Sequence, residues 1–203
     1  APDASTLGQP TLDIQVPLNG SSFNYFVQGV ENTSGTPTIT ASASGYTNAT
    51  TTVTVAAPGF DILGLSGAIT TLSANDPFLV RLGARNVGNT GLAAEQAIRA
   101  GGAALTATVT NSNQTAAQLV TTATTGQQVS VIIPVGLARS GNTVVAGGVE
   151  FDPIGLGVDT VAASIPGIVA FPGAPDSVAV TVSAPAINMF TPAQGTGRLG
   201  NGL

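Results

Sequence analysis

Apolar and polar residues alternate along five short stretches of the sequence, and many of the apolar positions carry β-branched side chains. Alternation with a period of two is the pattern of a half-buried β-strand. The stretches are Asp13–Val16, Thr38–Ala43, Thr52–Val55, Leu105–Thr110 and Val178–Val182. Glycine, proline and asparagine mark turns between them, and the turn signals lie at 18–20, 33–35, 58–59, 140–142 and 172–173.

One segment departs from this pattern. Leu92–Ala100 has good helix propensity, and the pair Gly101 and Gly102 ends it. We expect a short helical turn or a loop there. The rest of the sequence predicts an all-β fold, in which short strands spaced roughly 8 to 12 residues apart form a β-sandwich.

Three blocks of sequence recur in the same order further along the chain. The matching pairs are Asp13–Leu18 with Ser130–Val135, Thr38–Gly45 with Thr160–Gly167, and Val53–Pro58 with Val180–Pro185. The offset between matching residues grows from 117 to 122 to 127, so that two loops each account for five residues. Ordered recurrence of this kind predicts a tandem repeat.

The repeat divides the sequence into three parts. Residues 1–57 correspond to the carboxyl half of a repeat, residues 58–185 to one complete repeat, and residues 186–203 to the start of another or to a flexible or exchanged tail. The first part lacks strands equivalent to residues 58 to about 126, and half a sandwich leaves an open apolar face and unpaired edges. A longer array, strands from another chain, or direct packing on the neighbouring unit would complete it.

The repeated blocks resemble bacterial immunoglobulin-like repeats of the invasin and intimin type, which occur in large extracellular surface proteins. The resemblance rests on Gly35–Ala41, on Gly45 and Tyr46, and on the closing stretch Thr51–Val55. Ala107–Asn113 and Ala117–Val120 are similar to that family's central strands. The repeat is longer than is usual in the family, and residues 92–102 look inserted. The resemblance implies tandem Greek-key sandwiches, one complete and one partial, that space or display something outside the cell.

Charged residues are scarce, and several reactive residue types are absent. The 203 residues include five arginines and ten Asp or Glu, without lysine, histidine, cysteine or tryptophan. Histidine triads, cysteine nucleophiles, lysine Schiff bases and His/Cys zinc sites are therefore excluded. Two carboxylates suffice for a glycosidase, but nothing marks a cleft, and aromatic residues that could stack on a sugar make up only 4%. We expect no enzyme.

Charge and hydropathy also limit the partners. With a net charge of −5, the chain has no basic stripe for nucleic acid. No stretch approaches the roughly 20 apolar residues of a membrane helix, so we expect no membrane insertion. The lysine-free, threonine- and glycine-rich composition is typical of secreted bacterial proteins, which predicts an extracellular or cell-surface location. Self-association or contact with neighbouring repeats is the expected partnership.

Three carboxylates are the candidates for a metal site. Glu150, Asp152 and Asp159 lie close together in the sequence and could bind calcium, which takes six to eight oxygen ligands. Glu150 and Asp152 would share one face of an extended strand. The repeat places Gln28 and Val30 at the matching positions, however, so we expect solvated loop charges and no cofactor.

The segment Gly195–Gly200 matches the letters of a dinucleotide-binding motif. No strand–turn–helix context accompanies it, so we expect a linker tail. Taken together, these observations predict a non-catalytic structural repeat segment of an extracellular bacterial fibre, adhesin stalk or surface-layer protein, which could polymerise by strand complementation between subunits. The alternative is a binding module that recognises a carbohydrate or a host receptor through its end loops.

Overall fold

The computed structural model describes residues 1–30, 33–172 and 176–187. Strands are the only regular elements within these ranges, and no helix occurs in them, so the all-β prediction is confirmed. The strands are β1 (Thr38–Ala41), β2 (Ala49–Thr52), β3 (Pro58–Leu63), β4 (Ala68–Thr70), β5 (Asp76–Arg85), β6 (Leu92–Glu95), β7 (Leu105–Asn111), β8 (Ala117–Val120), β9 (Thr125–Gly126), β10 (Gln128–Ile133), β11 (Val149–Pro153), β12 (Gly157–Ser164) and β13 (Ser177–Ser183).

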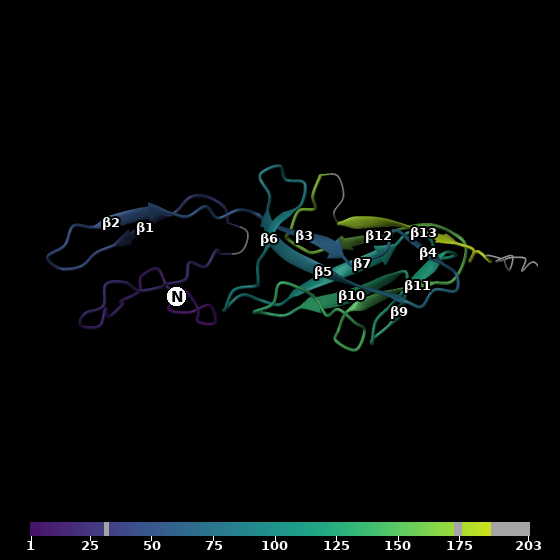
Figure 1. Cartoon of the computed structure of the whole chain (residues 1–203), viewed down its shortest axis with the longest axis horizontal. Coiled ribbons are helices and arrows are strands. Elements are labelled where there is room, and N and C mark those ends of the chain that lie inside the picture. The colour runs from purple at the N-terminus through teal and green to yellow at the C-terminus, as the bar shows by residue number, and fades with distance from the viewer. Residues whose placement is uncertain (31–32, 173–175, 188–203) are drawn as a thin grey trace, which may run out of the picture.

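Strands β3 to β13 form a sandwich-like body of two sheets, which we call the sandwich (Figure 1). One sheet has the order β10-β7-β12-β13-β4, and the other has the order β3-β5-β11-β8-β9, with β6 also paired to β5. Inward residues alternate with outward ones, as in β10, where Val129, Val131 and Ile133 are buried and their neighbours are exposed. This alternation places one continuous apolar core between the sheets.

Phenylalanine side chains contribute the largest members of that core. Phe60, Phe78 and Phe151 come from β3, β5 and β11, and each is at most 1% exposed. Leu119 and Ile133 fill the space beside them. Burying side chains of this size stabilises the sandwich by roughly 1.5–3 kcal/mol each.

Strand β5 organises the second sheet. One edge of β5 pairs with β3 along six residues, from Pro58 with Ala84 to Leu63 with Leu79. The other edge is shared by β11, by the segment 138–140 and by β6. Both edges of this long strand are therefore paired within the sandwich.

The two ends of the sandwich are joined through a parallel strand pair. Strand β4, near the start of the sandwich, lies parallel to β13, its last strand, with Val182 opposite Ile69. The amide of Thr181 donates to Gly67 O at 2.9 Å, and that of Thr71 donates to Ser183 O at 3.0 Å. The chain enters the sandwich near β3 at one end and leaves it after β13 at the other (Figure 1).

Residues 1–57 project from the sandwich as an extended arm (Figure 1). Within the arm, β1 and β2 form a separate two-stranded antiparallel sheet. None of its described residues is buried. Large apolar side chains lie exposed along it, namely Leu7, Leu12, Val16, Leu18, Phe23, Tyr25, Phe26, Val27, Val30 and Tyr46. The arm therefore contains strand-forming sequence without a core of its own.

Several elements lie elsewhere in the structure than the sequence predicts. Asp13–Val16 is not a strand, and no strand among the described residues pairs with it, whereas the matching strand β10 pairs with β7. The strand predicted at Thr52–Val55 lies at Ala49–Thr52. Pairing with β1 weakens beyond Thr52 because Pro37 accepts from Val53 N but has no amide to return.

Two further predictions differ from the structure. At Leu92–Ala100, where the sequence predicts a helical turn or a loop, residues 92–95 form strand β6 and residues 96–99 form a loop. Residues 92–95 pair with the edge of β5, and this tertiary pairing outweighs helix propensity. The pair Pro58 and Gly59 forms the start of β3 and not a turn. Gly59 lies so close to the Phe171 ring that a Cβ atom would collide with it. The glycine at this position therefore reflects packing.

Candidate functional site

The three predicted calcium ligands do not lie in one place. Glu150 and Asp152 lie on the same half-buried face of β11, as the two-residue spacing predicts, whereas Asp159 lies on β12 in the other sheet. Asp152 accepts a hydrogen bond from Gln118 Nε2 at 2.7 Å. Among the described residues, no group of three or more acidic side chains could hold a metal ion.

Asp159 is a buried carboxylate and not the solvated loop charge that the sequence suggested. Its side chain belongs to a residue that is 0% exposed. Oδ2 accepts from Asn111 Nδ2 at 2.9 Å, and Oδ1 accepts from Ser112 N at 2.7 Å, Ser112 Oγ at 2.9 Å and Asn113 N at 2.9 Å. These four donors replace the water that the carboxylate loses on burial. The cluster fastens β12 to the turn that follows β7.

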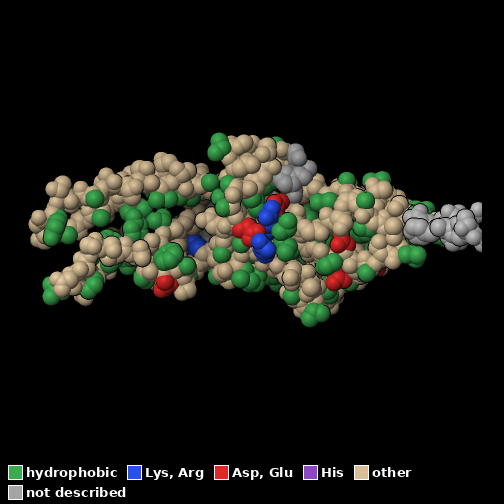
Figure 2. Space-filling view, viewed as in Figure 1, with side chains coloured by type: hydrophobic (Ala, Val, Ile, Leu, Met, Phe, Trp, Pro, Cys, Tyr) green, Lys and Arg blue, Asp and Glu red, His purple; other side chains and the backbone are tan. Residues whose placement is uncertain are grey.

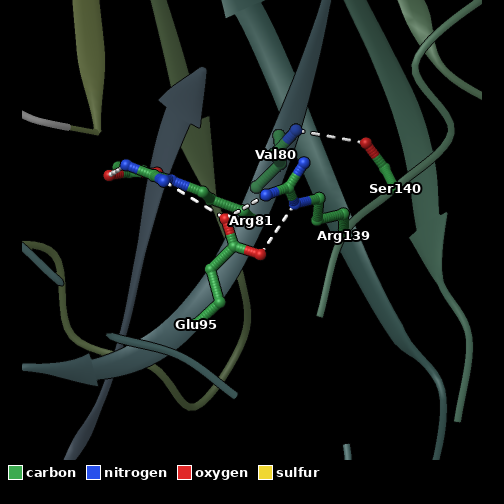
Figure 3. Close-up of polar contacts among 6 residues, drawn as sticks. Val80, Arg81, Glu95, Arg139 and Ser140 are labelled. Carbon is green, nitrogen blue, oxygen red and sulfur yellow. Dashed lines mark hydrogen bonds and ion pairs between the residues drawn. The ribbon is translucent and has the colours of Figure 1, made fainter. Parts of the chain in front are cut away.

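Four charged residues form an ion network across the face of the other sheet (Figure 3). Arg81 on β5 binds both carboxylate oxygens of Asp61 on β3, at 2.6 and 2.9 Å. Arg81 also contacts Glu95 on β6 at 3.2 Å, and Glu95 receives two bonds from Arg139 at 2.7 and 2.6 Å. Figure 2 shows these red and blue side chains gathered near the middle of the molecule. The network joins β3, β5, β6 and the segment after β10.

The ion pairs favour the charged forms of Glu95, Arg81 and Arg139. Hydrogen bonds from Arg139, and then from Arg81, lower the pKa of Glu95 below its ordinary value. The hydrogen bond to Asp61 raises the pKa of Arg81, and that to Glu95 raises the pKa of Arg139. A general acid needs a protonated carboxyl group near neutral pH. The pKa of Glu95 is lowered instead, so this residue is better suited to linking strands than to transferring a proton.

A groove of about 690 Å³ runs beside β10 and opens to solvent. Its walls come from β10, from the turn after β8 and from the loop at 137–148. Ser130, Arg139 and Asn142 are polar residues along a largely apolar lining. The backbone at Ser140 is fixed, since its hydroxyl accepts from Val80 N at 3.1 Å and its amide donates to Val80 O at 2.9 Å. The backbone at one side of the groove is therefore held by hydrogen bonds, but few polar groups are present to orient a ligand.

Arg85 ties the start of β3 to the loop between β12 and β13 at a second, smaller pocket of about 280 Å³. Its Nε donates to Pro58 O at 2.8 Å and its Nη1 to Asn89 Oδ1 at 2.7 Å. Nη2 donates to Val169 O, and the guanidinium lies 4.5 Å from the centre of the Phe171 ring. One side chain thus holds the strand that leaves the arm against the loop between β12 and β13.

Sequence reasoning did not anticipate these polar clusters. Asp61, Arg81, Glu95 and Arg139 lie far apart in the sequence, and only the pairing of β5 with β3, with β6 and with the segment after β10 brings them together. The sequence held one signal for this network. Its two acidic residues and two arginines are a large share of the few charged residues in the chain. Opposite charges on neighbouring strands are typical of cross-strand pairs.

No protein-family model matches the chain. No curated protein is similar to it at a significant level. No helix in the part of the chain that the structure describes is long and apolar enough to cross a membrane. The motif at Gly195–Gly200 lies outside the described residues.

Proposed function

We propose that this chain is a non-catalytic structural repeat segment of an extracellular bacterial fibre, adhesin stalk or surface-layer protein. Its units would be immunoglobulin-like Greek-key sandwiches, one complete at 58–185 and one partial at 1–57, with the next unit starting at 186. Neighbouring repeats would be its main contacts. The scarcity of charge suits this role, because few charges need to be desolvated where units meet.

The observation that carries the proposal is the shared register of two strand pairs. Offsets of 122 and 127 map the β1–β2 pairs Thr38 with Thr52 and Ile39 with Thr51 onto Thr160 with Ala179 and Val161 with Val178. The bridge between Gly35 and Val55 maps in the same way onto Gly157 with Val182. Register is specified residue by residue in a sheet, so agreement over this length supports a common unit.

The parallel pair of β4 and β13 supports a role in transmitting force. One strand lies near the start of the sandwich and the other at its end, and the chain enters and leaves at opposite ends (Figure 1). When the ends are pulled apart, β3 carries the load first because it precedes β4 and pairs with β5. Once β3 has left β5, β4 and β13 are drawn in opposite directions along their length. The hydrogen bonds between them are then loaded together rather than one after another, which resists extension.

Single-molecule stretching of the full chain with Thr71→Pro tests this proposal. The amide of Thr71 donates to Ser183 O. Thr71 is also the second residue of the turn from Thr70 to Ser73, and proline is readily accepted at the second position of such a turn. Thr71→Ala keeps the amide and is the matched control. We expect a lower unfolding force for Thr71→Pro alone, with only about 1 kcal/mol lost from the equilibrium stability. Equal forces for both variants would contradict a role for the parallel pair.

The groove beside β10 favours one alternative, a module that binds a carbohydrate or a host receptor. Retention of the full chain on a glycan array would support that function if Asn142→Ala, at the groove, weakened it and Asn75→Ala, outside the groove, did not. Absence of retention, together with a discrete force peak on stretching, supports the structural function.

A further inference from the structure

The arm presents the face and edges of a sandwich that is missing its partner strands. This inference rests on the proposed tandem organisation and concerns what covers that face. At an offset of 117, Leu12 and Val16 match Val129 and Ile133 of β10. Val129 and Ile133 are 2% and 0% exposed, whereas Leu12 and Val16 are 39% and 45% exposed. The arm therefore has core-type residues at core-type positions, but no core covers them.

The same comparison applies to the hairpin of the arm. Ile39, Val53 and Val55 match Val161, Val180 and Val182, which form part of the buried core of the sandwich. In the arm these three side chains are only half-buried. Figure 2 shows hydrophobic side chains exposed along the arm. Exposed apolar surface of this kind marks a site of interaction.

The edges of β1 and β2 are open as well. In the sandwich, β12 pairs with β7 on its outer edge and β13 pairs with β4 on its own. The equivalent edges of β1 and β2 have no strand partner in the described residues, because these two strands form a sheet by themselves. Open strand edges offer unpaired backbone groups to an added strand.

A second copy of the chain does not supply what is missing. The strands required are the equivalents of β4 and β7, and in each copy these strands already lie within its own sandwich. At the offset of 127, residues 186–203 correspond to residues 59–76, so they include positions equivalent to β3 and β4 but none equivalent to β7. Exchange of that tail between subunits would leave the edge of β1 unpaired.

We propose that the arm is a docking surface for a partner segment with the strand pattern of residues 58–126, which completes a second sandwich around β1 and β2. The complete unit specifies the contacts. Residues 39–41 of β1 would pair as residues 161–163 pair with 109–111, and Val55, three residues after β2, would lie opposite an equivalent of Ile69. Leu12, Ile14 and Val16 would face the new core.

Tyrosine provides a specific probe of this event. The chain has two tyrosines, Tyr25 and Tyr46, and no tryptophan, so its near-ultraviolet tyrosine signal comes from the arm alone. Tyr46 is 80% exposed. It matches Ile168, which packs against the core of the sandwich. Completion of the second sandwich should therefore bury Tyr46.

The experiment adds the partner segment to the full chain. A second copy of residues 58–126 is joined ahead of Ala1, so that residues 1–9 serve as a linker, and Tyr25→Phe leaves Tyr46 as the sole tyrosine. We expect a new near-ultraviolet circular dichroism signal from Tyr46. We also expect at least a hundredfold slower amide exchange in β1 and at residues 54–56, because the equivalents of these residues pair with β7 and β4 in the sandwich.

The matched control carries Val109→Asp in the added copy only, since Val109 is fully buried in the sandwich. A charge at this position should prevent docking without altering the native sandwich. Equal exchange in β1 and at residues 54–56 for the fusion, its control and the unfused chain would overturn the proposal. Burial of Tyr46 in the unfused chain on concentration would also overturn it, because a second copy would then be the occupant. Neither result would bear on the unfolding force of the sandwich, which tests the proposed function separately.

Discussion

Gly45 and Gly167 lie at the same position of two turns that are 122 residues apart, with φ angles of 82° and 81°. In each turn the amide of the following residue donates to the carbonyl three residues before it, Tyr46 to Ala43 and Ile168 to Ile165, both at 3.1 Å. The surroundings differ, because Ile168 packs against the core while Tyr46 is exposed. The local conformation is thus shared although only one turn belongs to a complete sandwich.

This difference predicts unequal effects of the same substitution. A Cβ atom at positive φ costs about 1–2 kcal/mol. Gly167→Ala should therefore lower the free energy of unfolding of the sandwich by that amount, whereas Gly45→Ala should leave it unchanged. Denaturant titration followed by far-ultraviolet circular dichroism measures both. A matching loss in Gly45→Ala would mean that the arm and the sandwich unfold as one unit.

The buried carboxylate of Asp159 leads to a second prediction. Asp159→Ala would leave Asn111 Nδ2 without this acceptor in the interior and would release the less buried amides of Ser112 and Asn113. We expect a loss of about 1–3 kcal/mol, since that is the cost of an unsatisfied buried donor. Asp152→Ala is the control, because its carboxylate is half-buried and should cost well under half as much. Similar losses in the two variants would argue against the Asp159 cluster as the main polar tie.

The ion network predicts a pH dependence. Because its arginine partners lower the pKa of Glu95, the stability that Glu95 contributes is present above its unfolded pKa and is lost as the pH falls through the lowered folded value. A glutamate in the unfolded chain has a pKa of about 4.3, so this stability should be lost below that pH. Denaturation midpoints against pH for the natural chain and for Glu95→Gln measure it. The two curves should converge in acid, and parallel curves would contradict the assignment.

Two strands of the sandwich could be predicted because alternation is a local signal. The observed strand β7 extends one residue beyond the predicted Leu105–Thr110. Strand β13 extends one residue beyond each end of the predicted Val178–Val182. These strands are paired on both edges, so their burial follows the sequence pattern directly. Asp13–Val16 has the same pattern and is not a strand, because a strand also needs a partner at its edge.

The polar clusters could not be predicted because they depend on pairing between distant segments. The sequence marked Glu150, Asp152 and Asp159 through their closeness along the chain. The structure separates Asp159 from the other two by placing β11 and β12 in different sheets. Conversely, Arg81 and Arg139 meet at Glu95 only because β6 and the segment after β10 share one edge of β5.

The length released on stretching tests the central claim most directly, that the chain contains one complete unit and one incomplete unit. The full chain is pulled by its ends, and the gain in contour length at the force peak is measured. Unfolding from Pro58 to Ser183 alone should release roughly 400 Å, while the arm extends beforehand without a peak. A single peak that is roughly 200 Å longer would show that residues 1–57 unfold together with the sandwich, and would contradict the account.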